Sequence, residues 1–271
     1  ADKLLLDFKD KPRSFNLIFS ARSIENLGFI RGFQEKIGKG FPLIGISLQD
    51  RINFHKNFIF YRDFLSDTAC LGLLFVGKID FTWIHKHGWK PLGITHTITK
   101  TKDNLISEID GKPAVRIYQD YLGYDVDKLK KELKYISLLY PLGIYSPSEK
   151  NYLLRSITKI NDDGTLNTQG EVKENQKVKI MIATKESCLK ATKEAIEEIK
   201  SLTKRRMNFL LFFESPARVF LLGSEINKEL ELIKEENLNF VGIMSYGQIF
   251  PTNKFLGEIQ FHEHSICFLG F

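Results

Sequence analysis

The chain has 271 residues, 43% of them hydrophobic and 27% charged, which is the balance of a folded globular protein and excludes a disordered one. Its length allows one large or two modest domains, each with a core of its own. The longest apolar runs, Leu71–Val76 and Phe209–Phe213, fall far short of the roughly 18 residues of a membrane-spanning helix. We therefore expect no membrane insertion.

Charge and cysteine content indicate which partners and which compartment to expect. The net charge is +6, but lysine and arginine alternate with acidic residues along most of the chain, so we expect no nucleic-acid partner. The three cysteines, Cys70, Cys188 and Cys267, lie far apart and lack metal-ligand spacing. Unpaired thiols of this kind are typical of a reducing compartment, which predicts a cytoplasmic protein.

The first part of the chain is predicted to be rich in strands. An apolar strand at 15–19 leads through a loop, with Ser23 as helix N-cap, to a helix whose apolar residues recur at helical spacing up to Ile37. A strand at 41–46 follows. The remaining expected strands are 58–61, 69–76, 81–85 and a hairpin of 94–99 with 105–109.

Helices are expected next, the first beginning at Pro113 and the second running over 126–136. A connector near 140–150 then suggests a boundary, so we expect one region at 1–140 and another at 141–271. Within the second region the expected elements are strands at 152–157 and 177–183 and a helix at 189–199.

The last part of the chain repeats the first. A strand at 209–213, a loop, a helix and a strand at 239–245 follow one another as at the start. Ala-Arg occurs in both loops, and 23 residues separate Arg22 from Gly45 while 24 separate Arg218 from Gly242. This register indicates a duplicated β-loop-α-β unit. The expected fold class is α+β, with mixed β-sheets flanked by helices.

Several motifs, in order, resemble those of one known family. They are Gly88-Trp-Lys-Pro-Leu-Gly93, Asp110-Gly-Lys-Pro-Ala114, Leu154-Arg155 and Gly242-Ile-Met-Ser-Tyr-Gly-Gln-Ile249. Together they are similar to the signatures of the FIST family (F-box and intracellular signal transduction proteins), with 1–140 as a FIST N-like region that lacks the usual first module and 141–271 as a FIST C-like region. A shortened member or a fragment would fit.

The resemblance implies a sensory domain that binds a small, amino-acid-like molecule and passes that state to a signalling output protein. It implies no catalytic activity and no cofactor. Two departures bear on the ligand. Where the family tends to have Phe-Ser-Cys, this chain has Phe213-Glu214-Ser215, so no thiol can act there; where the family tends to have Tyr-Gly-Glu, Gln248 removes a negative charge.

Three arginines are candidates for anion recognition. Arg218 and its counterpart Arg22 follow apolar strands, in loops where a guanidinium can grip a carboxylate with two hydrogen bonds. Either arginine could instead pair with a structural carboxylate. Arg155 interrupts an apolar strand and needs a partner if its face is buried, although a solvated face would explain it equally well.

Neutral polar residues near the second copy complete the expected ligand site. Ser245, Tyr246 and Gln248 offer donors and acceptors at a strand end, beside glycines (Gly242 and Gly247) that let the backbone approach a ligand closely. A polar turn leaving a core strand is the alternative. The predicted ligand-binding residues are Arg22, Arg155, Ser215, Arg218, Ser245, Tyr246 and Gln248.

Other chemistry finds little support. The sequence has no nucleophile elbow, phosphate loop, dinucleotide fingerprint or zinc-protease motif, so no catalytic residue is assigned. The pairs His85/His87 and His262/His264 lack a spaced third ligand, and we expect no metal. The aromatic residues of the middle segment are expected in the core. They are Phe58, Phe60, Phe75 and Phe81.

A sensor of a small polar metabolite is therefore the predicted function. A protein-protein interaction module is the alternative, as the F-box members of the family suggest, and an enzyme is third. Convergent arginines in a pocket would favour the sensor, and an exposed apolar patch would favour the interaction module.

Overall fold

The computed structural model describes residues 13–21, 27–38, 41–48, 57–147, 150–203, 207–251 and 259–271. The chain forms two compact units. Unit 1 comprises residues 1–88 and 185–271, and unit 2 comprises 89–184. The expected boundary near residue 140 thus falls inside unit 2, and a division at 140 stays a prediction about sequence regions. No helix in the described ranges is long and apolar enough to cross a membrane.

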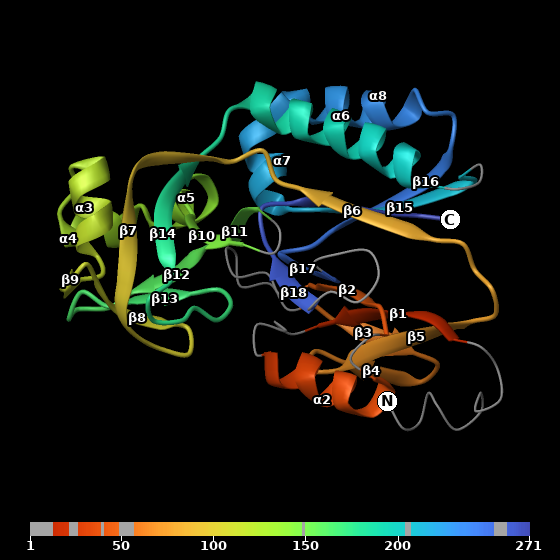
Figure 1. Cartoon of the computed structure of the whole chain (residues 1–271), viewed down its shortest axis with the longest axis horizontal. Helices are drawn as coiled ribbons and strands as arrows, with labels where there is room; N and C mark the ends of the chain where they lie inside the picture. The colour runs from red at the N-terminus through yellow and green to blue at the C-terminus, as the bar shows by residue number, and fades with distance from the viewer. Residues whose placement is uncertain are drawn as a thin grey trace. The chain divides into compact units, whose positions relative to one another are not determined.

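Unit 1 contains two mixed sheets (Figure 1). The first has the order β18-β17-β2-β1-β5, with bounds Ile259–His262, Gly247–Pro251, Leu43–Ser47, Arg13–Ser20 and Cys70–Val76. The second has the order β16-β15-β19-β6, with bounds Asn239–Met244, Phe209–Glu214, Ile266–Gly270 and Thr82–Lys86. A separate hairpin joins β3 (Ile59–Tyr61) to β4 (Phe64–Ser66).

The helices of unit 1 cover the outer faces of these sheets. Their bounds are α2 Leu27–Ile37, α6 Lys185–Leu202, α7 Pro216–Leu222, η2 Gly223–Glu225 and α8 Ile226–Lys234. Ile30 of α2 packs with Ile18 and Phe261 of the first sheet. On the second sheet, α6 and α8 contribute Ile196 and Ile233 to a cluster with Phe268. Figure 1 shows α2 beside the first sheet and α6 and α8 beside the second.

The core of unit 1 lies between the two sheets. Phe15, Ile46 and Phe250 of the first sheet pack against Trp83 and Phe213 of the second, all with less than a tenth of their surface exposed. Removing such side chains from water is the main stabilising term of a fold. Because strands alternate their faces, Gln248 points to the same side as Phe250, and His85 to the same side as Trp83. This apolar core therefore continues into polar residues along its strands.

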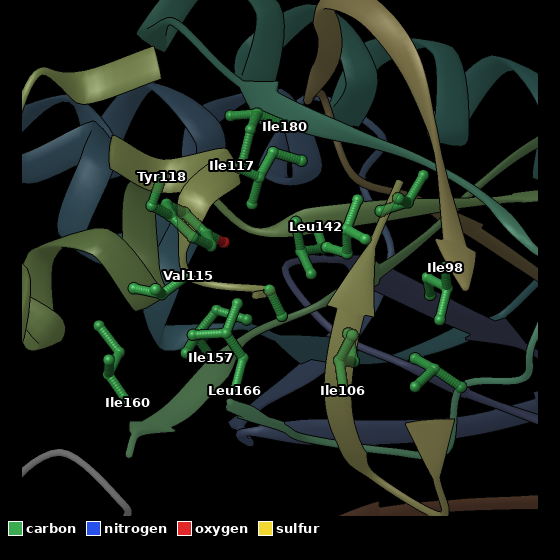
Figure 2. Packing of buried hydrophobic residues seen from close by; sticks show 14 of the residues in the cluster. Ile98, Ile106, Val115, Ile117, Tyr118, Leu142, Ile157, Ile160, Leu166 and Ile180 are labelled. Atoms are coloured by element: carbon green, nitrogen blue, oxygen red, sulfur yellow. The ribbon is translucent and has the colours of Figure 1, made fainter. Parts of the chain in front are cut away.

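Unit 2 has a sheet of eight strands, ordered β11-β10-β14-β7-β8-β13-β12 with β9 beside β8. The strands are β7 Lys90–Lys102, β8 Leu105–Ile109, β9 Lys112–Pro113, β10 Leu142–Ser146, β11 Asn151–Arg155, β12 Ile157–Ile160, β13 Leu166–Thr168 and β14 Lys177–Ile182. The helices are α3 Arg116–Leu122, α4 Val126–Lys131 and α5 Leu133–Leu139. Figure 2 shows Tyr118 of α3 among the aliphatic core, where its hydroxyl donates to the carbonyl of Tyr140 over 2.8 Å.

The structure confirms the α+β class and the internal repeat. In the first copy β1 pairs in parallel with β2 and antiparallel with β5, and in the second copy β15 pairs likewise with β16 and β19. The matched glycines also take equivalent places. Gly45 lies opposite Ile18 and Gly242 lies opposite Phe212, each beside the central strand of its copy.

Two glycines expected to face a ligand instead make room for rings. A Cβ on Gly242 would lie 2.2 Å from the ring of Phe212, and one on Gly247 would lie 2.1 Å from the ring of Phe261. The close approach that these glycines allow is therefore used in core packing.

The family-like motifs also have structural explanations. Gly88 adopts a φ of +91°, and a Cβ there would lie 2.9 Å from the backbone of Cys188. Gly93, with a φ of +69°, leaves room for Tyr121. Asp110 and Gly111 both have positive φ, as a tight hairpin turn requires, and this turn joins β8 to β9. The expectation that Pro113 begins a helix is wrong, because this turn pairs Pro113 with β8 instead.

The aromatic residues of the middle segment divide into two groups. Phe75 and Phe81 pack against the core between the sheets, as expected. Phe58 and Phe60 are 50% and 77% exposed, so their expected place in the core is wrong. Phe60 lies in β3 and Phe58 comes just before it. The β3–β4 hairpin pairs with no other strand among those described, so these residues are not part of a larger sheet.

Candidate functional site

Three predicted residues, Ser215, Ser245 and Gln248, meet Glu214 where β15 and β16 end in unit 1. Glu214 ends β15, and its carbonyl accepts from the amide of Ser245, 2.9 Å away, just after β16. Ser215 caps α7, with its hydroxyl oxygen accepting from the amide of Ala217 at 3.3 Å. Gln248, at the start of β17, donates from Nε2 to the carbonyl and to the hydroxyl of Ser245, each at 3.1 Å. We call Ser215, Ser245 and Gln248, together with Glu214, the strand-end cluster.

Arg218 lies beside this cluster, fully buried. Its Nε donates to Glu214 Oε1 at 2.8 Å, and its Nη1 donates to the carbonyl of His87 at 2.7 Å. Its Nη2 donates to Thr192 Oγ1 at 2.7 Å, to the carbonyl of Cys188 at 3.2 Å and to Glu229 Oε1. The guanidinium thus joins β15, α6, α7, α8 and the segment after β6. This geometry favours the structural alternative for Arg218, because its donors already face groups of its own chain.

Two carboxylates share this one guanidinium. Both Glu214 and Glu229 are buried, and each forms an ion pair with Arg218. Burial raises the pKa of Glu214 well above its usual range; the charge of Glu229 raises it further, and that of Arg218 opposes the rise. Glu214 Oε2 has no hydrogen-bond donor among the described residues. A proton on Glu214 would remove the excess negative charge and let this carboxyl donate to Glu229, a hydrogen bond that also raises the pKa of Glu214.

The raised pKa makes stability depend on pH. Between the usual glutamate pKa of about 4.3 and its raised value, Glu214 binds a proton in the folded state alone, so its contribution lowers stability by about 1.4 kcal/mol per unit of rising pH. Glu214→Gln should remove that slope. Urea unfolding at several pH values from 5 to 8 measures it, with the half-exposed Glu194→Gln as control. An unchanged slope in Glu214→Gln would show that Glu214 is ionised throughout.

The other predicted residues lie elsewhere. Arg155, 5% exposed, belongs to unit 2, where it donates to the carbonyls of Leu154 at 2.8 Å and Glu171 at 3.4 Å and lies against Gly170. A solvated strand face is therefore wrong for Arg155. Arg22, with Ser23, lies outside the described residues. Tyr246 is partly buried between Ser245 and β17.

Two histidines far apart in sequence meet beside the strand-end cluster. The rings of His85 on β6 and His262 on β18 lie 3.9 Å apart between centroids. His262 is the register partner of Gln248, so both side chains point to the same face of the first sheet. The polar continuation of the core thus comprises Ser245, Gln248, His85 and His262, which we call the polar layer. Within the described ranges, no group of three or more His, Cys, Asp or Glu residues could hold a metal ion.

Sequence reasoning missed part of this arrangement. The alternation of side chains along a strand predicts that His85 and His87 lie on one face, and this was the available signal for the histidine. It could not indicate that His262 of the other sheet lies opposite His85. Glu229 and Thr192 gave no signal beyond helical spacing. Cys188 is not a reactive thiol, because burial raises its pKa to about 11.

Two family models match the chain. One, described as the FIST N domain, matches residues 1–112, and the other, described as the FIST C domain, matches 114–251. These matches confirm the expected FIST family, whereas the F-box part of the expected family name is wrong.

A relative from Methanocaldococcus jannaschii, named "Uncharacterized protein MJ1623", is similar over most of this chain. It is 25% identical over 255 residues, which make up 84% of this chain and 48% of the relative. The chain therefore spans about half the length of this relative.

Proposed function

Because the chain belongs to the FIST family, whose domains are sensory domains of signal transduction, we propose that it binds a small polar metabolite, amino-acid-like in chemistry, in the polar layer of unit 1. Binding would change the state of a signalling output protein. We place this sensor in the cytoplasm, where the exposed thiol of Cys70 would stay reduced.

One observation carries the choice of site. Gln248 is fully buried, yet its Oε1 has no hydrogen-bond donor among the residues that the structure describes. Its orientation is fixed, because Nε2 must face the carbonyl of Ser245. A buried acceptor without a donor costs about 1–3 kcal/mol, and a ligand ammonium or amide would remove that cost. Gln248 therefore supports a donor-bearing ligand.

The surroundings of Gln248 suit such a ligand. Ser245 and Tyr246 add hydroxyl groups, and His85 and His262 add imidazole nitrogens that can donate or accept hydrogen bonds. These side chains are mostly buried, so a ligand would have to open the ends of β16 and β17 in order to enter. Binding that requires opening shifts the population of two states, which is what a sensor transmits.

Three other predicted residues make structural contacts instead. Arg218 and Ser215 hold the start of α7 at the strand-end cluster, and Arg155 bonds to carbonyls within unit 2. We propose binding without turnover, because the Ser215 hydroxyl already serves as a helix cap and forms no described nucleophile-base pair.

A thermal-shift screen with the free amino acids tests this proposal. A compound at a hundred times its Kd stabilises the fold by about 2.7 kcal/mol, so at least one should raise Tm by several degrees. Gln248→Leu should abolish the shift by removing the acceptor. Gln119→Leu makes the same change in unit 2 and is the control, so the thermal shift should persist in this variant. A shift that survives Gln248→Leu would place the ligand elsewhere.

An exposed apolar surface favours the second candidate function, a protein-protein interaction module. The β3–β4 hairpin and its flank expose large apolar side chains: Phe58, Phe60, Tyr61, Phe64 and Leu65, each at least half exposed. Clusters of this kind on a soluble protein commonly mark contact sites. Loss of signalling in Phe60→Ser, with ligand-induced stabilisation intact, would assign the output contact to this hairpin.

A further inference from the structure

The internal repeat allows equivalent sheet edges of the two copies to be compared. The two copies contain the three-stranded sets β2-β1-β5 and β16-β15-β19, in the same order and with the same strand directions. In the first copy β17 pairs antiparallel with the outer edge of β2, and in the second β6 pairs antiparallel with the outer edge of β19. Each set is thus extended on one side only.

The counterpart of the covered β2 edge is the outer edge of β16. No other described strand pairs with it. The contrast in burial is plain, because all five residues of β2 are buried, whereas Val241 and Met244 of β16 are 47% and 58% exposed. Those two residues point to opposite faces of the sheet, so the edge is open on both sides.

The sequence of β16 carries none of the features that protect an exposed edge. Asn239-Phe-Val-Gly-Ile-Met244 has no charged residue and no proline. Natural edge strands usually carry lysine, proline or a bulge that prevents another strand from pairing. An uncharged apolar strand of six residues is instead suited to pairing with a further strand.

We propose that this edge pairs antiparallel with β16 of a second copy of the chain. A two-fold axis perpendicular to the sheet places the helix-covered faces of the two copies on the same side. Two residues that pair across the axis are then both even-numbered or both odd-numbered, so that their side chains lie on the same face. With Gly242 on the axis, Val241 faces Ile243 and Phe240 faces Met244 of the second copy. Every such pair is apolar, and no like charges meet.

A closed dimer fits this edge better than head-to-tail pairing, in which each molecule contacts the next through a different edge. Pairing β16 with itself uses the same surface on both partners, so the contact closes as a dimer. Pairing β16 with a different edge strand, such as β5, would leave one edge free on each molecule and would build fibres. The dimer joins two four-stranded sheets into one continuous sheet.

Sedimentation velocity between about 1 and 100 μM tests this proposal. The protein should sediment as a dimer, and Val241→Lys should weaken the dimer at least tenfold, since it sets two lysines near the axis. Met244→Lys sets a lysine opposite Phe240 of the second copy, on the other face of the sheet, and should also weaken the dimer. Both positions are half exposed, so the fold should persist, which circular dichroism checks.

Leu73→Lys is the matched control, because Leu73 is 42% exposed on β5, an edge strand of the first sheet. It should leave the dimer intact. A wild-type monomer across the whole range would overturn the proposal, and so would a dimer that survives both β16 variants. Dissociation by Leu73→Lys alone would assign the contact to β5 and would also overturn it.

Discussion

Replacing Arg218 with alanine should lower the free energy of unfolding by about 3–5 kcal/mol. The change leaves Glu214 and Glu229 buried without their shared counter-charge, and it removes donors to His87 and Cys188. Arg218→Lys should restore only part of the loss, since an ammonium cannot reproduce the planar guanidinium geometry. Urea unfolding at pH 7 measures each difference.

Arg116→Ala is the control for the loss of an arginine ion pair. The Arg116 side chain is 57% exposed and pairs with Asp120, so its removal should cost less than about 1 kcal/mol. If Arg218→Ala were as mild as Arg116→Ala but abolished ligand binding, Arg218 would be a ligand clamp after all. The structural role assigned to its hydrogen bonds would then be wrong.

Gly88→Ala should destabilise the protein by about 2–5 kcal/mol. A side chain costs about 1–2 kcal/mol in the left-handed region, and overpacking against backbone adds about 1–3 kcal/mol. At Gly88 the added Cβ would lie 2.9 Å from Cys188 Cα and from the carbonyl oxygen of Ser187 at the start of α6. Those backbone atoms cannot rotate away as a flexible side chain could.

Gly77→Ala separates the two contributions. Gly77 has a φ of +100°, but nothing lies within 4 Å of an added Cβ. Gly77→Ala should therefore lower the free energy of unfolding only by the backbone cost of the left-handed conformation, about 1–2 kcal/mol. Equal losses in the two variants, measured by urea unfolding, would mean that the approach of α6 to Gly88 adds nothing.

The repeat could be predicted because it depends on local pattern. Apolar strands, helical spacing and the two Ala-Arg pairs are all visible along the sequence, and they predict the register of Gly45 and Gly242. The expected loop position of Ala217 and Arg218 is wrong, because both residues lie in the first turn of α7. The pairing of a strand from each copy of the repeat with the sheet of the other copy could not be predicted. β6 follows β5 in sequence but pairs with β19, and β17 follows β16 but pairs with β2, because these pairings depend on long-range packing.

The role of Arg218 shows the same limit. The sequence placed it in a loop after a strand, and both a ligand clamp and a structural ion pair fit that position. Only folding brings His87, Cys188 and Glu229 to its nitrogens, from as far as 131 residues away. Ser245 and Gln248 were predicted together because they are three residues apart, whereas His85 and His262 meet only across two sheets.

Hydrogen-deuterium exchange tests most directly the claim that the polar layer senses a ligand. It compares the protein alone with the protein saturated by the free amino acid that stabilises it most. The account predicts slower exchange in 82–87, 245–250 and 259–264, the segments that carry His85, Gln248 and His262, with little change in unit 2. Protection confined to 89–184 would contradict it, because the ligand would then bind to a unit that contains none of these residues.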